Sequence, residues 1–165
     1  MNDIFLGLGG NLGNRQSYLE KALKILSDSG CTILKCSSVY WSAPWGNPEL
    51  RPFLNLVCKV HFEGSPEEFL DCCQETEKKM GRKTRKGGYK NRIIDIDLLF
   101  FHQMQIHTDS LIVPHPEIAN RKFVLRALVE IDEHFVHPLL KKSMKELLLE
   151  TTDPLEVKLW GRINI

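Results

Sequence analysis

The stretch RIIDIDLLFF, residues 92–101, places two carboxylates within the most apolar segment of the chain. Side chains at positions i and i+2 of a strand point to the same face of a sheet. The alternation therefore predicts a strand with two unlike faces, one of which carries Asp95 and Asp97 together. The opposite, core-facing set is Ile94, Ile96, Leu98 and Phe100.

Two adjacent carboxylates repel each other and need a compensating cation when their surroundings are apolar. Mg²⁺ takes oxygen ligands and commonly shares them with substrate phosphates. Asp is also a poor strand former, which weighs against a purely structural role. We therefore predict a metal site at Asp95 and Asp97. The alternative is a solvated pair, or one neutralised by Arg92 and Lys90.

The segment GRKTRKGGYKNR, residues 81–92, carries three arginines and three lysines without an acid. Guanidinium groups bind the oxygens of a polyphosphate in bidentate fashion, which suits Arg82, Arg85 and Arg92. Gly87 and Gly88 would let the segment move as a lid. The competing interpretation is an ordinary solvated loop.

The rest of the chain predicts an α+β fold. Strand patterns at 4–9, 32–41, 53–62 and 92–101 alternate with helices that begin after Asn14 and at the capping box Ser65–Glu68. This β-α-β-β-α-β order favours a ferredoxin-like antiparallel sheet with helices packed on one face and the other face open to a ligand. Further helices are expected near 122–131 and 143–150.

The usual nucleotide-binding motifs are missing from the sequence. GLGGNLG, residues 7–13, resembles G-x-G-x-x-G, but Leu12 stands where the third glycine is required. A P-loop is also absent. Phosphate chemistry must therefore depend on metal ions and arginines.

Composition limits the class of protein. The 165 residues suit one domain, 1–165, and a net charge of +1 gives no global attraction to nucleic acid or membrane. No apolar run approaches a membrane span and no export signal is visible, so we expect a cytoplasmic protein, by default a monomer. The odd number of cysteines, five, predicts unoxidised thiols, with Cys72–Cys73 on an apolar helix face rather than in a redox or metal site.

Several further residues suit a flat heterocycle and its phosphates. Phe53 and Asn55 share the non-core face of their strand and could combine ring stacking with amide hydrogen bonds. Gln74 and Glu77 lie three residues apart on one helix face, and His115 stands between two prolines. Taken singly, each is more commonly a surface or local hydrogen-bonding residue.

Taken together, these segments resemble the 6-hydroxymethyl-7,8-dihydropterin pyrophosphokinases of folate biosynthesis. The resemblance runs nearly end to end. It is carried by FLGLGGNLGN, SSVYWSAPWG, FLNLV, RIIDIDLLFF, VPHP and NRKFVL. It implies a ferredoxin-like fold and transfer of the β,γ-pyrophosphoryl unit of ATP to the hydroxymethyl group of a reduced pterin, with release of AMP. The chain departs from the family pattern at Ser42-Ala43-Pro44, Trp45, Phe53, Thr84, Tyr89 and Pro116.

The resemblance also implies roles for particular residues. Asp95 and Asp97 would hold two Mg²⁺ ions, Arg82 and Arg92 would act on the phosphates as charge builds, and Glu77 would support the metal site. The residues expected to bind ATP are Gln74, Arg82, Arg85, Tyr89, Arg92, Leu98, His115 and Arg121. Those expected to bind the pterin are Ser42, Ala43, Trp45, Phe53, Asn55, Asp95 and Phe123.

Three other functions compete with this one. A nucleic-acid binder on the same fold would need an aromatic, basic central strand, whereas this chain places acids there. A non-catalytic small-molecule sensor would bind without turnover. A different D-x-D metal enzyme, such as a nuclease or glycosyl transferase, would be distinguished by its products.

Overall fold

The computed structural model describes residues 3–82 and 90–165. Four residues with predicted roles lie outside the described residues. They are the lid glycines Gly87 and Gly88 and the expected nucleotide contacts Arg85 and Tyr89.

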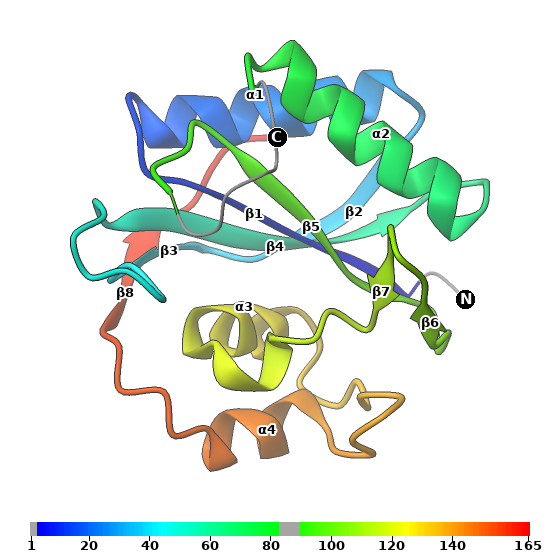
Figure 1. Cartoon of the computed structure of the whole chain (residues 1–165), viewed down its shortest axis with the longest axis vertical. Helices are drawn as coiled ribbons and strands as arrows, with labels where there is room; N and C mark the ends of the chain where they lie inside the picture. The colour runs from blue at the N-terminus through cyan, green and yellow to red at the C-terminus, as the bar shows by residue number, and fades with distance from the viewer. Residues whose placement is uncertain (1–2, 83–89) are drawn as a thin grey trace.

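The centre of the fold is a six-stranded antiparallel sheet in the order β5-β1-β4-β3-β8, with β2 also paired to β4 (Figure 1). This order confirms the predicted β-α-β-β-α-β arrangement, and β8 adds an edge strand that the sequence pattern did not reveal. A separate two-stranded ribbon joins β6 to β7. The strands are β1 (Ile4–Gly10), β2 (Thr32–Cys36), β3 (Val39–Ser42), β4 (Phe53–His61), β5 (Asp95–Phe101), β6 (Ile106–His107), β7 (Ile112–Val113) and β8 (Val157–Gly161).

Side-chain caps define where the helices begin. Asn14 accepts a hydrogen bond from the Ser17 amide at the start of α1, and Ser65 forms the predicted capping box at the start of α2. Each cap satisfies amides that have no partner inside the helix. The helices are α1 (Arg15–Asp28), α2 (Pro66–Lys79), the 3₁₀ turn η1 (Ile118–Asn120), α3 (Lys122–Asp132) and α4 (Met144–Glu150).

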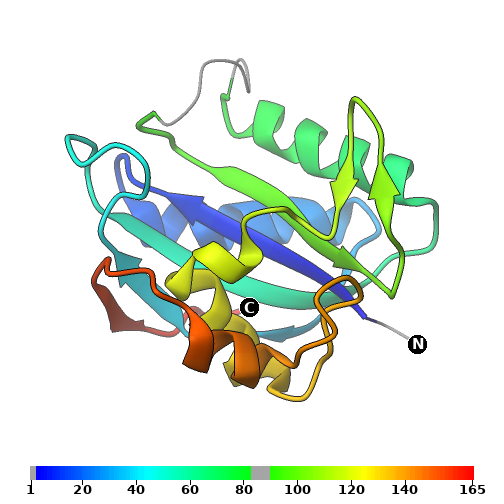
Figure 2. The ribbon, with the colours of Figure 1, turned by 60° about the horizontal axis from the view of Figure 1, so that its bottom comes forward.

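The two faces of the sheet are covered by different helices. Helices α1 and α2 pack together on one face, over a core that includes Leu6, Leu56 and Phe69. Helices α3 and α4 lie across the other face, over a second core that includes Phe5 and Leu128 (Figure 2). The added helices therefore cover part of the face that the sequence left open, and any ligand must bind beside them.

The prediction that Phe100 shares a face with Ile96 and Leu98 was wrong, because β5 is irregular. Ile96 and Leu98 enter the core beneath α1 and α2 as predicted, but Phe100 does not. The pairing of β5 with β1 shifts register between Phe5 and Leu6. This shift turns Phe100 to the opposite face, where its ring makes an edge contact with Phe5 at a centroid distance of 5.9 Å.

The predicted strand over 32–41 is divided into β2 and β3 at Ser37 and Ser38. The backbone amide of Ser37 donates to the Val57 carbonyl, and the Ser37 hydroxyl accepts from the Val57 amide. The hydroxyl thereby accepts the hydrogen bond that a backbone carbonyl would otherwise accept from β4. The residues of β3 are consequently paired with β4 in a register shifted from that of β2. This change of register is typical of a β-bulge.

The cysteine prediction was wrong for one pair. Cys36 and Cys58 lie opposite each other on β2 and β4 and form a disulfide across the two strands. The other three cysteines remain as thiols. Burial raises the pKa of the Cys31 thiol to about 12 and also raises that of Cys72, so both are protonated at neutral pH.

No helix within the described residues is long and apolar enough to cross a membrane.

Candidate active site

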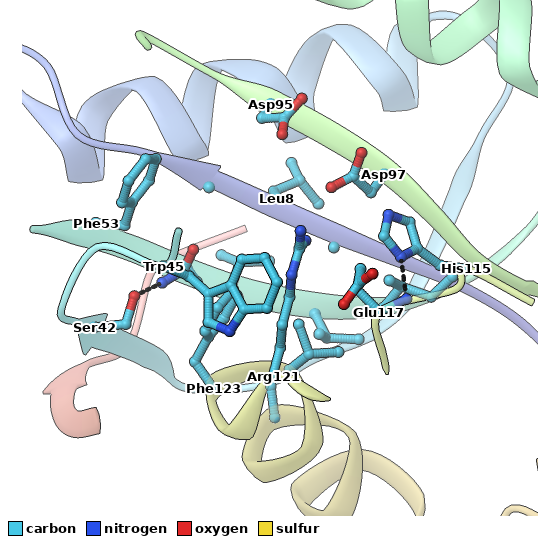
Figure 3. Close-up of a pocket in the computed structure, with 18 of the residues that line it drawn as sticks. Leu8, Ser42, Trp45, Phe53, Asp95, Asp97, His115, Glu117, Arg121 and Phe123 are labelled. Atoms are coloured by element: carbon cyan, nitrogen blue, oxygen red, sulfur yellow. Dashed lines mark hydrogen bonds between the residues drawn. The ribbon is translucent and has the colours of Figure 1, made fainter. Parts of the chain in front are cut away.

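A cavity of about 300 Å³ opens on the sheet face that carries the two aspartates. It lies between strands β1, β4 and β5 and the beginning of α3, beside the 43–52 loop that precedes β4 (Figure 3). Aromatic, amide, acidic and basic side chains all reach it. The residues labelled around it in Figure 3 are Leu8, Ser42, Trp45, Phe53, Asp95, Asp97, His115, Glu117, Arg121 and Phe123.

The glycines of β1 form part of the cavity lining, since Gly7 and Gly9 both reach it. A Cβ atom on Gly9 would lie 2.5 Å from Oδ1 of Asn55, whereas one on Gly7 would only touch Leu99 at 3.6 Å. The missing side chain at Gly9 therefore leaves the space that Asn55 occupies. GLGG is thus a site element, although it is not a dinucleotide-binding motif.

Asp95 and Asp97 line the cavity from alternate positions of β5, as the sequence predicted. Asp95 accepts a charge-assisted hydrogen bond from Arg82, and Nη1 of Arg92 lies 3.5 Å from its other carboxylate oxygen. Two guanidinium groups therefore approach one carboxylate. The positive charge predicted near the aspartate pair is present in the folded chain.

Arg82 reaches Asp95 because α2 ends sharply. Gly81 has a φ of +96°, and the chain then folds back so that the Arg82 amide donates to the Glu77 carbonyl. This pairing resembles the closing bond of a Schellman turn. The Arg82 side chain, 8% exposed, bridges Asp95 and the buried carboxylate of Glu77. Glu77 also accepts from the backbone amide of Ile96, so it ties α2 to the aspartate-bearing strand.

Asn11 is a site residue that sequence reasoning missed. Its side chain is 3% exposed and joins three segments: it donates to the Arg51 carbonyl and to Asn91, and it accepts from the Arg92 amide. It thereby holds the backbone of Arg92 beside the cavity. The turn-forming sequence GGNLGN concealed this role, because asparagine is common in turns for local reasons.

The end of the cavity near β3 and β4 combines an amide with two aromatic rings. Asn55 donates from Nδ2 to the Ser42 hydroxyl at 2.6 Å, and this leaves its Oδ1 able to accept from a ligand. Phe53 and Phe123 line the cavity near this amide. The arrangement suits a flat, hydrogen-bonding heterocycle, as the Phe53–Asn55 pair predicted.

The other end of the cavity is lined by His115, Glu117 and Arg121. Nδ1 of His115 accepts from the Glu117 amide at 3.1 Å, which fixes the orientation of the ring and places its N–H on Nε2. Arg121 stands at the beginning of α3, where its side chain rises into the cavity. These residues come from one short segment, and Glu117 was not predicted.

Helix α3 is held against the sheet by a carboxylate outside the cavity. Glu130 accepts hydrogen bonds from the Ser38 amide and hydroxyl and from the Tyr40 hydroxyl. Burial and the bond to Glu130 raise the pKa of Tyr40 to about 12. Burial alone would raise the pKa of Glu130, but the hydrogen bonds from Tyr40 and Ser38 outweigh it and lower that pKa.

The structure brings most of the predicted site residues together. Ten of them line the cavity, and Arg82 forms an ion pair with Asp95, which is one of these ten. Within the described part of the chain, the cavity lining does not include Gln74, Ala43 or Leu98. The side chain of Leu98 is buried beneath α1 and α2. The ten are Ser42, Trp45, Phe53, Asn55, Arg92, Asp95, Asp97, His115, Arg121 and Phe123.

Residues 5–133 match the sequence model of the family described as 7,8-dihydro-6-hydroxymethylpterin-pyrophosphokinase (HPPK). The chain belongs to the HPPK family. Its relatives include a 2-amino-4-hydroxy-6-hydroxymethyldihydropteridine pyrophosphokinase of Aquifex aeolicus, 40% identical over 153 residues that cover 92% of this chain and 94% of the relative. The Bacillus subtilis enzyme of the same name is 35% identical over 162 residues, covering 97% and 92%.

Solved structures of HPPK-containing proteins share the fold. The Plasmodium falciparum HPPK-DHPS structure with pteroate superposes with a TM-score of 0.69, at 16% identity, over 89% of this chain. The chain spans only 44% of that longer protein. At this identity the likeness establishes the α+β fold, and the evidence for HPPK chemistry comes from the family match and the cavity.

Proposed function

We propose that this chain transfers a pyrophosphoryl group from ATP to 6-hydroxymethyl-7,8-dihydropterin, within one domain comprising residues 1–165. The hydroxymethyl oxygen attacks the β-phosphorus, and the bond from that phosphorus to the α–β bridging oxygen breaks. AMP leaves, and the hydroxyl proton passes to solvent. The observation that carries the proposal is that the two aspartates lie in one cavity between an aromatic–amide end and a His–Arg end.

Asp95 and Asp97 are assigned as the ligands of two Mg²⁺ ions. Among the described residues, no three histidine, cysteine, aspartate or glutamate side chains gather into a site able to hold a metal alone. Two carboxylates suit Mg²⁺ nevertheless, because it commonly takes its other ligands from phosphates and water. When bound, the ions supply charge neutralisation at the phosphates and activation of the attacking hydroxyl.

Arg82 and Arg92 are assigned to the phosphates. Both guanidinium groups already lie against Asp95, so they need little movement to reach an oxygen held next to it. Phosphoryl transfer depends mainly on alignment and on neutralising charge. Glu77 supports this function indirectly, because it holds Arg82 and the Ile96 amide at the same carboxylate.

The aromatic–amide end is assigned to the pterin. Phe53 and Phe123 offer ring faces, and Asn55, oriented by Ser42, offers a carbonyl oxygen to an amino or ring N–H group. Trp45 lines the same cavity, and Ala43 from the same loop is included in the proposed pterin set because the family resemblance implies it. This assignment places the pterin next to the aspartates in the same cavity.

The His–Arg end is assigned to ATP. Nε2 of His115 and the guanidinium of Arg121 can donate to phosphate or ribose oxygens. The proposed nucleotide set is completed by residues that the family resemblance implies, namely Gln74, Arg85, Tyr89 and Leu98. The chain is proposed to act as a monomer in the cytoplasm.

A product analysis tests the proposal. The chain is incubated with ATP, Mg²⁺ and 6-hydroxymethyl-7,8-dihydropterin, and the nucleotide and pterin products are identified by mass. We expect AMP and a pterin pyrophosphate, both lost when EDTA removes the metal. ADP with a pterin monophosphate would contradict the proposed transfer. Unchanged ATP with tight pterin binding would favour a sensor.

A further inference from the structure

Trp45 and Arg121 form a stack inside the cavity. The guanidinium carbon of Arg121 lies 4.8 Å from the centroid of the Trp45 ring. The two side chains come from different parts of the fold, the 43–52 loop and the beginning of α3, and they lie side by side in Figure 3. A cation over a tryptophan face is attracted by the quadrupole of the ring, which makes the face electron-rich. The contact therefore joins the two proposed ligand ends of the cavity.

The loop that presents Trp45 is fixed by hydrogen bonds on both sides. The Ala43 amide donates to the Glu156 carbonyl, and the Arg51 amide donates to Oδ1 of Asn91. Gly46, with a φ of +85°, turns the chain immediately after the tryptophan. The indole ring is thus presented by an anchored turn.

The guanidinium of Arg121 lies over the ring of Trp45. Among the described residues its Nε is buried without a hydrogen-bond partner. A guanidinium carries five N–H donors, so it can keep its contact with the ring and still donate to a phosphate. An arginine side chain loses rotamer freedom when it binds a ligand, and a contact that already restrains the side chain removes part of that entropy loss.

We propose that Trp45 is a positioning residue for ATP: its ring holds the Arg121 guanidinium in the orientation that binds a phosphate. This inference rests on the proposed function, because it takes the His–Arg end as the nucleotide site. It assigns to Trp45 a role beyond contact with the pterin. The contact involves only side chains of this chain, so we expect Trp45 to contribute to nucleotide binding even when no pterin is present.

The experiment measures the affinity for α,β-methylene-ATP with Mg²⁺ by calorimetry, without pterin. We expect Trp45→Leu to weaken binding by about threefold to tenfold, the range of a partly buried cation–π contact. Trp45→Phe, which retains an aromatic face, should stay within about twofold of the wild type. In an Arg121→Met background, Trp45→Leu should have no further effect.

Trp160 supplies a matched control. It also lies against an arginine, with the Arg15 guanidinium carbon 5.3 Å from its ring centroid, but it is 51% exposed and does not line the cavity. Trp160→Leu therefore removes a similar stack elsewhere in the molecule and should leave nucleotide affinity unchanged. Thermal unfolding of each variant confirms that it is folded.

Two results would overturn the proposal alone: a Trp45→Leu variant that binds the analogue as tightly as the wild type, or one that weakens binding equally with and without Arg121. In either case the wild-type chain would still form AMP from ATP. A wild-type chain that binds no Mg-nucleotide would overturn the proposed function and the role of Trp45 together.

Discussion

At the scale of single residues, Asp97 offers a test of the metal assignment. We expect Asp97→Asn, which removes one charge at nearly constant volume, to lower kcat/KM by at least about a hundredfold, because metal ions supply several kcal/mol of charge stabilisation. The melting temperature should stay within about 3 °C of the wild type. Steady-state kinetics and thermal unfolding measure both, and wild-type turnover would exclude Asp97 as a required ligand.

The β1 glycines permit a matched comparison. A Cβ on Gly9 would meet Asn55 Oδ1 at 2.5 Å and displace the amide that we assign to the pterin. A Cβ on Gly7 would make an ordinary 3.6 Å contact with Leu99. We therefore expect Gly9→Ala to raise the KM for the pterin by about tenfold, roughly the effect of one lost hydrogen bond, with little change for ATP. Gly7→Ala should have a smaller effect, and equal effects would argue against the assignment.

Predictions for single residues succeeded where the periodicity of a strand alone determines the face to which a side chain points. The alternation in β5 placed Asp95 and Asp97 on one face, and the structure confirms it. It failed for Asn11, whose partners lie 40 and 80 residues away in the chain. Nothing in the local sequence distinguishes such an asparagine from a turn former, because its role depends on contacts that only the fold creates.

At the scale of elements, Glu130 is expected to anchor α3 and hence Arg121 and Phe123. Replacing Glu130 with Gln exchanges charge-assisted hydrogen bonds from Tyr40 and Ser38 for neutral ones. The free energy of unfolding should fall by about 1 kcal/mol near pH 7. Urea unfolding followed by circular dichroism measures this change.

The pH dependence of that difference has a defined sign. Because the pKa of Glu130 in the folded chain lies below its ordinary value of 4.5, its ionised form stabilises the fold above that value. This contribution is lost as the pH falls through the folded pKa. The difference in the free energy of unfolding between the wild type and Glu130→Gln should therefore disappear below about pH 4.5. Glu133→Gln, which removes an exposed pair with Lys145, is the control and should change stability by less than about 0.5 kcal/mol.

Element-scale prediction located the main helices and strands, but it missed the irregularities. The shift in β5 depends on how β1 pairs with it, and the division between β2 and β3 depends on Ser37 bonding to Val57 across the sheet. Strand β8 pairs at the edge with β3, and its sequence does not alternate strongly enough to be recognised alone. Each miss involves a partner strand distant in sequence.

At the scale of the whole molecule, the family resemblance correctly predicted the architecture, but the sequence analysis did not predict the disulfide between Cys36 and Cys58. Five cysteines allow many pairings, and only the alignment of β2 with β4 brings Cys36 opposite Cys58. A bond between residues 22 positions apart mainly restricts the unfolded chain. The chain-entropy account gives a stabilisation of about 3 kcal/mol for a loop of this size.

The disulfide leads to a prediction for global stability. Cys36→Ala should lower the free energy of unfolding by about 3 kcal/mol in the absence of reductant. Adding reductant should lower the free energy of unfolding of the wild type by a similar amount, because the reduced wild type and the Cys36→Ala variant both lack the cross-link. Alkylation in denaturant should label three cysteines before reduction and five after it. Labelling of all five without reduction, together with a Cys36→Ala variant as stable as the wild type, would mean that the fold is maintained by its two cores and its capped helices without this cross-link.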